Sequence, residues 1–375
     1  MKSYRIALLP GDGIGPEVSG EACKVVDAAG VKHGFSIEWV NLPFGAKHYE
    51  KTGEVLPDTA LDEIALCDAM LLGAVGSPSV KPGILERGIL LKLRFFFDQY
   101  INLRTACSYK NVPGPVRLPD GIQINSVIVR ENTEDFYMGI GSVSQENGKL
   151  DFPFEAERGL YKFTGCLKAD FSPSAQAAVQ LGALSRPGIE RITRYAFDLA
   201  KKRGEIEVVL ASKANAVPSL YGFLDEETRR IASGYPGIAL NIQNVDALCY
   251  HLVRKPWDYR VILCPNLFGD IVSDLMSALT GGLGLAPGGN IGESLSMFEP
   301  VHGSAPDIAG TGKANPLAAV LCASMMLNHI GENVAAQTIE TAVKTYLECS
   351  GKKPVELGGD SLCADVGDAV AELIG

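Results

Sequence analysis

The chain has 375 residues, of which 46% are hydrophobic, 41 are glycine and nine are cysteine, and its formal net charge is −10. This length and composition are typical of a two-domain or bilobal α/β enzyme. The negative charge argues against binding to nucleic acid or to an anionic membrane. The sequence shows no apolar run near the ~20 residues of a membrane span and no secretion signal, so we expect a cytoplasmic protein. The scattered cysteines are expected to be reduced thiols.

Strands and helices are predicted to alternate at the start of the chain. Residues 4–9, 35–40 and 69–73 are apolar enough for strands, and helices are expected up to residue 29 and over residues 58–66. This alternation predicts a parallel sheet with right-handed crossovers. The glycines at 11, 13 and 15 do not make a dinucleotide fingerprint, because Pro16 stands where G-x-G-x-x-G requires its last glycine.

Basic side chains recur near the ends of predicted elements. A helix over residues 86–94 would place Leu90 and Arg94 on one face, and Arg104 ends the apolar stretch that follows. Arg130 follows a strand expected at residues 124–129, and Lys213 follows another at 208–211. A lone arginine is usually a surface charge, but open α/β sheets bind ligands at strand ends. In an acidic chain, an anionic substrate would need such a local set of cations.

Later segments are less uniform. Residues 138–188 show few clear periods, whereas residues 188–203 predict an amphipathic helix with Ile189, Ile192, Ala196 and Leu199 on one face. Residues 218–233 are also expected to be helical. The glycine-rich segment 280–290 is interpreted as a hinge or ligand loop, and Pro316 as a helix start capped by Asn315.

Three acids follow predicted strands and form a candidate metal site. Residues 261–264 are expected to be a buried strand, and the helix after it would place Asp270 and Asp274 one turn apart on one face. Asp246 opens a helix after the strand expected at residues 238–242. Acids in a first helical turn can simply be solvated, but three carboxylates at strand ends suit Mg²⁺ or Mn²⁺. We therefore predict a divalent-metal site.

Long motifs resemble the β-decarboxylating dehydrogenases of 3-isopropylmalate, isocitrate, homoisocitrate and tartrate. The resemblance runs from Gly-Asp-Gly-Ile-Gly-Pro-Glu17 to the C-terminus, notably in Arg130-Glu-Asn-Thr-Glu, Asn266-Leu-Phe-Gly-Asp-Ile-Val-Ser-Asp274 and His302-Gly-Ser-Ala-Pro-Asp307. The segment Glu86-Arg-Gly-Ile-Leu-Leu-Lys-Leu-Arg94 is most like the 3-isopropylmalate branch.

This resemblance implies a bilobal α/β fold of the isopropylmalate dehydrogenase type, with a mixed, largely parallel sheet flanked by helices, and not a Rossmann fold. Residues 1–99 and 281–375 would form the cofactor domain. Residues 100–280 would form the substrate, metal and dimerisation domain, with an arm around residues 138–188 that clasps the partner subunit of a homodimer.

The resemblance also implies roles for individual residues in the NAD-dependent oxidation and decarboxylation of a 2-hydroxy acid. Arg94, Arg104 and Arg130 would bind the carboxylates of the substrate, and Asp246, Asp270 and Asp274 would bind Mg²⁺ or Mn²⁺. Lys213 would accept the hydroxyl proton and Tyr137 would protonate the enol carbon, with Lys213 and Asp246 acting in trans. The cofactor site would comprise Ile14, His302, Gly303, Ser304, Ala305, Asp307 and Asn315, and the Asp307 carboxylate would favour NAD over NADP.

The substituent on carbon 3 of the malate is left open by the sequence. Leu90 and Leu91 favour an alkyl group, as in 3-isopropylmalate, an intermediate of leucine biosynthesis, whereas Arg87 could face an anion. The Arg130-Glu-Asn-Thr-Glu motif is more like the isocitrate and tartrate branches. Tartrate, D-malate, homoisocitrate and isocitrate are therefore the alternative substrates.

Two further features bear on this interpretation. Thr105 stands where the family usually has proline, and more residues than usual separate Tyr137 from the helix at Ile189, which predicts a modified clasp. A non-enzymatic regulatory subunit is disfavoured, because Tyr137, Lys213 and the metal acids are all present.

Overall fold

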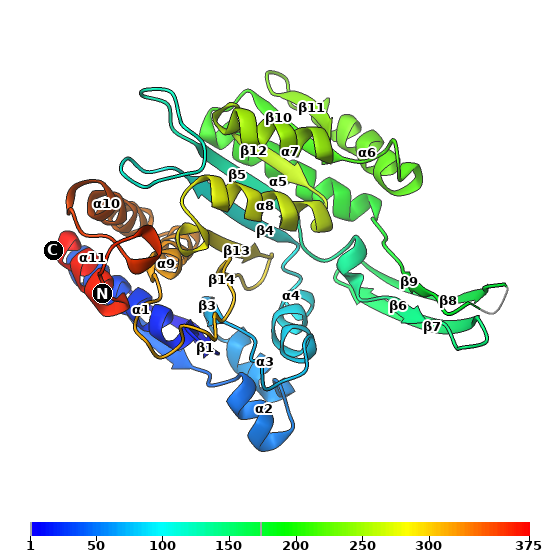
Figure 1. The fold of residues 1–375 in the computed structure, drawn as a ribbon, viewed down its shortest axis with the longest axis horizontal. Coiled ribbons are helices and arrows are strands. Elements are labelled where there is room, and N and C mark those ends of the chain that lie inside the picture. Colours follow the sequence, from blue (N-terminus) through cyan, green and yellow to red (C-terminus); the bar gives the residue numbers. More distant parts are fainter. Residues whose placement is uncertain (1, 173–174) are drawn as a thin grey trace. The chain divides into compact units, whose positions relative to one another are not determined.

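The computed structural model describes residues 2–172 and 175–375, which fold into two compact units (Figure 1). Unit 1 takes residues 1–127, 252–258 and 273–375, and unit 2 takes residues 128–251 and 259–272. Both are α/β in architecture, with mostly parallel strands flanked by helices, as predicted. Among the described helices, none combines the length and apolarity that crossing a membrane requires.

Unit 1 is built on strands in the order β4-β13-β14-β3-β1-β2. Their bounds are β1 (Lys2–Gly11), β2 (Phe35–Asn41), β3 (Ala69–Ala74), β4 (Ile101–Cys107), β13 (Pro287–Ile291) and β14 (Met297–Pro300). The pairs β1–β2, β1–β3 and β14–β3 are parallel, whereas β13 runs antiparallel to both β4 and β14. The predicted parallel arrangement of the first strands is therefore confirmed.

Helices pack on both faces of these strands. Successive side chains of a strand point to opposite faces, so a strand that is apolar throughout needs a cover on each side. In β3, Ala69 and Leu71 join one apolar cluster while Met70 and Leu72 join another. The first cluster lies under α1 (Gly15–His33), α9 (Leu317–His329), α10 (Asn333–Cys349) and α11 (Cys363–Ile374). The second lies under α3 (Asp58–Ala65), the π-helical segment η1 (Glu86–Leu91) and α4 (Lys92–Phe96). A strand buried on both faces explains the uninterrupted apolar run of β3.

The remaining elements of unit 1 are short connections. They are α2 (Ala46–Thr52), η4 (Pro256–Asp258), η5 (Leu283–Leu285) and η6 (Val355–Leu357).

Unit 2 contains strands in the order β11-β10-β12-β5, with β10 parallel to both β11 and β12. The strands are β5 (Asn125–Glu131), β10 (Glu207–Ser212), β11 (Ala239–Asn244) and β12 (Val261–Cys264). The helical segments are η2 (Phe136–Met138), α5 (Arg186–Arg203), η3 (Pro218–Gly222), α6 (Phe223–Ala232), α7 (Val245–Arg254) and α8 (Asn266–Leu279). Three elements, β5, α7 and α8, have residues in both units.

Helix α5 shows how local sequence sets an element. The Ser185 side chain accepts a hydrogen bond from the Gly188 N–H at its start, and Gly204 ends it in the left-handed conformation, with φ 71°. Ile189, Ile192 and Ala196 are buried as predicted. Leu199 is half-buried at the edge of this face, and Ala200 is buried as well.

Residues 138–188 contain strands that the sequence did not indicate. Strands β7 (Lys149–Arg158) and β8 (Tyr161–Asp170) pair antiparallel along their whole length, and β6 (Gly141–Val143) pairs with β9 (Ala178–Gln180). Alternate residues of β7, such as Leu150 and Ala156, are buried, so the hairpin has an apolar and a charged face.

The glycine-rich segment 280–290 is partly a strand, so its interpretation as a loop was wrong for its second half. Gly288, Gly289 and Asn290 lie buried in β13, between β4 and β14. A Cβ at Gly289 would lie 3.0 Å from the Phe298 ring, so glycine serves close packing there. Helix α9 begins at Leu317, one residue later than predicted, and Asn315 Oδ1 accepts from the Leu317 N–H at 3.1 Å.

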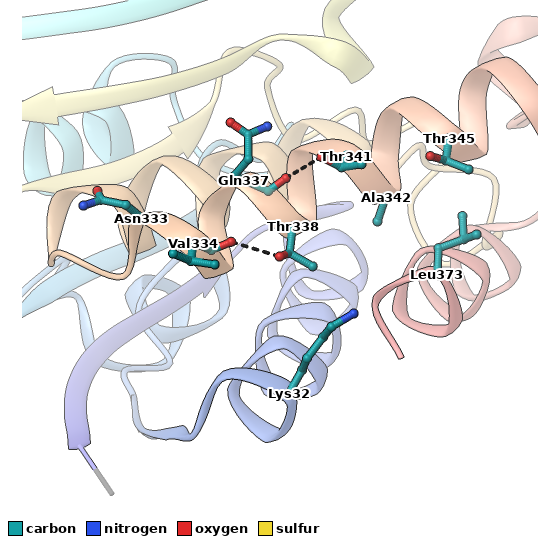
Figure 2. A pocket seen from close by; sticks show the side chains of 9 residues that line it. All are labelled: Lys32, Asn333, Val334, Gln337, Thr338, Thr341, Ala342, Thr345 and Leu373. Atoms are coloured by element: carbon teal, nitrogen blue, oxygen red, sulfur yellow. Dashed lines mark hydrogen bonds between the residues drawn. The ribbon is translucent and has the colours of Figure 1, made fainter.

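A groove of about 480 Å³ lies between α1, α10 and α11 of unit 1 (Figure 2). It is lined by Lys32, Leu373 and a row of residues of α10 that includes Thr338 and Thr341. The hydroxyls of Thr338 and Thr341 donate to carbonyl oxygens one turn earlier in their own helix, at 2.9 and 2.7 Å. The groove contains none of the predicted site residues, and we assign it no ligand.

Candidate active site

Two of the predicted metal acids lie where the sequence placed them. Strand β12 is fully buried, and α8 begins two residues after its end, so Asp270 and Asp274 are one helical turn apart. Their side chains are 37% and 57% exposed, which leaves carboxylate oxygens accessible to a cation.

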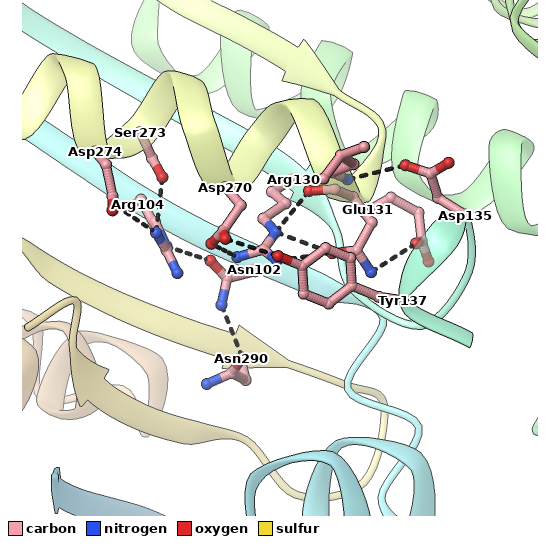
Figure 3. A network of polar contacts seen from close by, with 12 residues as sticks. Asn102, Arg104, Arg130, Glu131, Asp135, Tyr137, Asp270, Ser273, Asp274 and Asn290 are labelled. Carbon is pink, nitrogen blue, oxygen red and sulfur yellow. Dashed lines mark hydrogen bonds and ion pairs between the residues drawn. The ribbon is translucent and has the colours of Figure 1, made fainter. Parts of the chain in front are cut away.

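Arg130, Tyr137 and Asp270 form a cluster in unit 2 (Figure 3). Arg130 is the penultimate residue of β5 and is 2% exposed, and its NH1 donates to Asp270 Oδ1 at 2.5 Å. The Tyr137 hydroxyl donates to Asp270 Oδ2 at 2.8 Å, and the Arg130 guanidinium lies 5.0 Å from the Tyr137 ring centroid. A Cβ at Gly269 would collide with the Arg130 side chain, so glycine there lets Arg130 lie against α8. The Asp270 carboxylate therefore holds the Arg130 guanidinium on one oxygen and the Tyr137 hydroxyl on the other.

Residues that sequence reasoning missed hold this cluster in place. Asn266 Oδ1 accepts from Arg130 Nε and NH2 at 3.0 and 2.8 Å, and its Nδ2 donates to the carbonyl of Glu134. Asp135, at φ 62°, accepts from the Leu267 N–H at 2.9 Å and from the Tyr221 hydroxyl at 3.2 Å, which ties the turn after β5 to the start of α8. The signal available was the run of polar residues directly after a buried strand.

The acids of this turn are themselves buried. Glu131 accepts from the N–H groups of Thr133 and Glu134 at 2.9 and 2.7 Å. Burial, together with the neighbouring Glu134 carboxylate, raises the pKa of Glu131 to about 7. Glu131 Oε2 also accepts from Asn266 Nδ2 at 3.4 Å, so this buried carboxylate supports the residue that binds Arg130.

Lys213 and Asp246 form a separate pair in unit 2. They follow the adjacent parallel strands β10 and β11, and Lys213 Nζ donates to Asp246 Oδ1 at 2.7 Å. This hydrogen bond lowers the pKa of the Asp246 carboxyl. Among the described residues no three His, Cys, Asp or Glu side chains gather as a metal-ligand group. The carboxylate donors themselves fit Mg²⁺ or Mn²⁺.

Arg94 and Arg104 belong to unit 1. Arg94 is buried in α4, and its NH2 donates to Glu299 Oε1 at 2.8 Å, which excludes the interpretation as a solvated helix end. Arg104, in β4, donates to Asn102 Oδ1 and Ser273 Oγ at 2.7 Å and to Asp274 Oδ1 at 3.2 Å. Leu90 lies half-buried in η1, against the second apolar cluster.

The residues predicted to bind the cofactor lie along one loop of unit 1, and the turn after β1 contacts it. The Ile14 N–H donates to the Ser304 carbonyl at 2.9 Å. Burial lowers the pKa of His302, so its ring is neutral at pH 7. Ala305 has a φ of 39°, and Asp307 is exposed. Asn315 donates from Nδ2 to Glu356 Oε2 at 2.9 Å.

Comparisons with known proteins identify the family of the chain. The family described as isocitrate/isopropylmalate dehydrogenase matches residues 5–370. The 3-isopropylmalate dehydrogenase of Thermobifida fusca (strain YX) is 39% identical, with 100% of this chain and 98% of that protein aligned. The 3-isopropylmalate dehydrogenase of Bifidobacterium longum (strain NCC 2705) is 41% identical over 92% of this chain and 94% of its own length.

Solved structures of similar dehydrogenases have the same fold as this chain. The isocitrate dehydrogenase of Methylococcus capsulatus superposes with a TM-score of 0.85 at 36% identity, covering 99% of each chain. A β-decarboxylating dehydrogenase of Thermococcus kodakarensis gives a TM-score of 0.74 at 34% identity, covering 99% of this chain and 96% of that one. The chain therefore belongs to the isocitrate/isopropylmalate dehydrogenase family.

Proposed function

We propose that the protein oxidises and decarboxylates 3-isopropylmalate to 2-oxo-4-methylpentanoate and CO₂ with NAD⁺ as the oxidant, a step of leucine biosynthesis. The observation that carries the proposal is the Asp270 carboxylate, which aligns Arg130 and the Tyr137 hydroxyl on its two oxygens. The curated relatives at about 40% identity that cover nearly the whole chain support the substrate. A product assay tests it: NADH, CO₂ and the oxo acid should form in equal amounts, and NADH without CO₂ would refute decarboxylation.

The substrate is a dianion, and the arginines are the groups that would bind it. The guanidinium groups of Arg94, Arg104 and Arg130 would each donate to its carboxylates, as paired N–H groups do well. Lys213 Nζ would take the proton of the 2-hydroxyl, and the Tyr137 hydroxyl would deliver a proton to carbon 3 after CO₂ leaves. Bound NAD⁺ supplies the hydride acceptor. Asp246, Asp270 and Asp274 would hold Mg²⁺ or Mn²⁺, which would supply Lewis acidity to the reaction.

The proposed active unit is a homodimer in which the partner subunit supplies Lys213 and Asp246. This arrangement is supported by the Lys213–Asp246 pair, which holds both side chains together on neighbouring strands of one chain. The arm of β6 to β9 is the proposed clasp. The nine cysteines are all free thiols, which supports a cytoplasmic location.

Replacing Leu90 with alanine should weaken selection of the alkyl substituent. Removing its methyl groups should lower the kcat/KM for 3-isopropylmalate relative to D-malate by about 10- to 200-fold, the usual scale for a few methylenes. Leu61→Ala is the control, since Leu61 is buried in the same apolar cluster. It should lower the melting temperature and leave the substrate ratio unchanged. An unchanged ratio in Leu90→Ala would remove Leu90 from the pocket.

NAD should be preferred over NADP because of Asp307. A carboxylate facing the 2′-phosphate would repel it, and even 1.4 kcal/mol of repulsion gives about a tenfold preference in kcat/KM. Asp307→Lys should reduce that preference, whereas Asp360→Lys, at another exposed acid of unit 1, should not. Equal kcat/KM values for the two cofactors in the unmodified protein would contradict the assignment.

A further inference from the structure

A continuous path of hydrogen bonds joins the two arginines of unit 1. Arg104 Nε donates to Asn102 Oδ1 at 2.7 Å, and Asn102 Nδ2 donates to Asn290 Oδ1 at 2.8 Å. Asn290 Nδ2 then donates to Glu299 Oε1 at 2.8 Å, and the same oxygen accepts from Arg94 NH2 at 2.8 Å. Figure 3 shows the part from Arg104 to Asn290. The path therefore crosses β4, β13 and β14 and ends on α4.

Strand register places these side chains on one face. Asn290 lies directly opposite Asn102, and Gly288, two residues earlier, lies opposite both Arg104 and Glu299. Residues opposite or two apart share a face of a sheet, so the four polar side chains point the same way. A Cβ at Gly288 would lie 3.0 Å from the Glu299 carbonyl oxygen, so the glycine leaves the strands close together.

The charges at the two ends fix the direction of every bond. A carboxylate only accepts, so the Asn290 amide must turn its NH₂ group toward Glu299 and its oxygen toward Asn102. Asn102 must then donate to Asn290, which leaves its own oxygen to accept from the Arg104 guanidinium. Each amide therefore has one orientation that satisfies both neighbours. Asn290 is 0% and Asn102 1% exposed, so water does not compete for these bonds.

We propose that Asn290 is a positioning residue that, through Asn102 and Glu299, sets the guanidinium groups of Arg104 and Arg94 for substrate binding. The proposal rests on the proposed function, in which these arginines bind the carboxylates of the malate. Buried ion pairs such as Arg94–Glu299 add little to stability over apolar residues of similar volume, so fold stability alone is a weak reason to bury this set. Fixed arginines lose less side-chain freedom when the substrate binds.

The test compares Asn290→Ala with Ser324→Ala. Ser324 is also buried in unit 1, and the acceptors of its hydroxyl are the Ala336 carbonyl at 3.0 Å and Glu340 Oε1 at 3.4 Å. Asn290→Ala removes both hydrogen bonds of this side chain in the path and should raise the KM for 3-isopropylmalate about threefold to tenfold, while the KM for NAD stays within twofold. Ser324→Ala should change neither KM. In an Arg104→Lys background, Asn290→Ala should add less to the KM than it does alone, because both changes act on one guanidinium.

Crystal structures of both variants give a readout that does not depend on the substrate. In Asn290→Ala the Arg94 and Arg104 guanidinium groups should leave their positions or lose order, and in Ser324→Ala they should stay. If the unmodified protein does not turn over 3-isopropylmalate, the proposed function fails, and the arginine positions in Asn290→Ala still decide the positioning role. Unmoved guanidinium groups, or a KM change equal to that of Ser324→Ala, would overturn the proposal.

Discussion

Replacing Lys213 with methionine is expected to lower kcat by about 10²- to 10⁴-fold, the range for loss of a general base. Methionine keeps the length of the side chain and removes the amine that would accept the hydroxyl proton. Hydride transfer should be the step that stops, so the burst of NADH in the first turnover should disappear. Lys255→Met, at a lysine that follows α7, is the matched control and should retain full activity. A normal burst in Lys213→Met would show that another group takes this proton.

Mixing Lys213→Met with Tyr137→Phe tests whether the two residues act across the dimer. In a hybrid dimer with the trans arrangement, one site contains both an intact Lys213 and an intact Tyr137, so activity should return after subunit exchange. With both residues acting in one chain, each site would hold one defect and no activity would return.

Asp270→Asn is the second change expected to have a large effect. Its carboxylate is proposed to bind the metal and accepts from both Arg130 and Tyr137, whereas an amide must turn an N–H toward one of these partners. Turnover and Mn²⁺ affinity should each fall about 100-fold or more, since a metal's charge stabilisation amounts to several kcal/mol. Mn²⁺ binding by electron paramagnetic resonance measures the affinity directly.

The control for this change is Asp360→Asn, at an exposed acid of unit 1, which should leave turnover and Mn²⁺ binding unchanged. The unmodified protein should also lose activity in EDTA and regain it when Mg²⁺ is added back. Full activity in EDTA would exclude a metal role for Asp270 and its neighbours.

The parts of the fold that sequence could predict are those in which a local pattern decides the element. Strands β3, β10 and β12 are apolar runs buried on both faces, and each ends at a residue that changes the pattern. The placement of Lys213 and Asp270 followed from the ends of β10 and β12, and that of Arg130 from the end of β5. Element order and element ends were therefore enough to find most of the candidate site.

The parts that sequence could not predict depend on residues far away in the chain. In the sequence, Gly288 and Gly289 are typical of a loop. In the structure they lie against the Phe298 ring and the β14 backbone, where a larger side chain would not fit beside β13. In β7, Pro153 argues against a strand when only the sequence is considered. The antiparallel pairing with β8 shows that the strand continues through this residue. The path from Arg104 to Glu299 is likewise invisible in the sequence, because the register of β4, β13 and β14 creates it.

The kcat/KM values for malate and 3-substituted malates, measured with NAD and Mg²⁺, decide between the proposed substrate and its alternatives. The panel contains 3-isopropylmalate, isocitrate, homoisocitrate, tartrate and D-malate. We expect the kcat/KM for 3-isopropylmalate to exceed each of the others by at least about tenfold, the lower scale at which a hydrophobic pocket selects a few methylenes. A higher kcat/KM for isocitrate or tartrate would contradict the substrate assignment, and no oxidation of any of the five would contradict the proposed reaction itself.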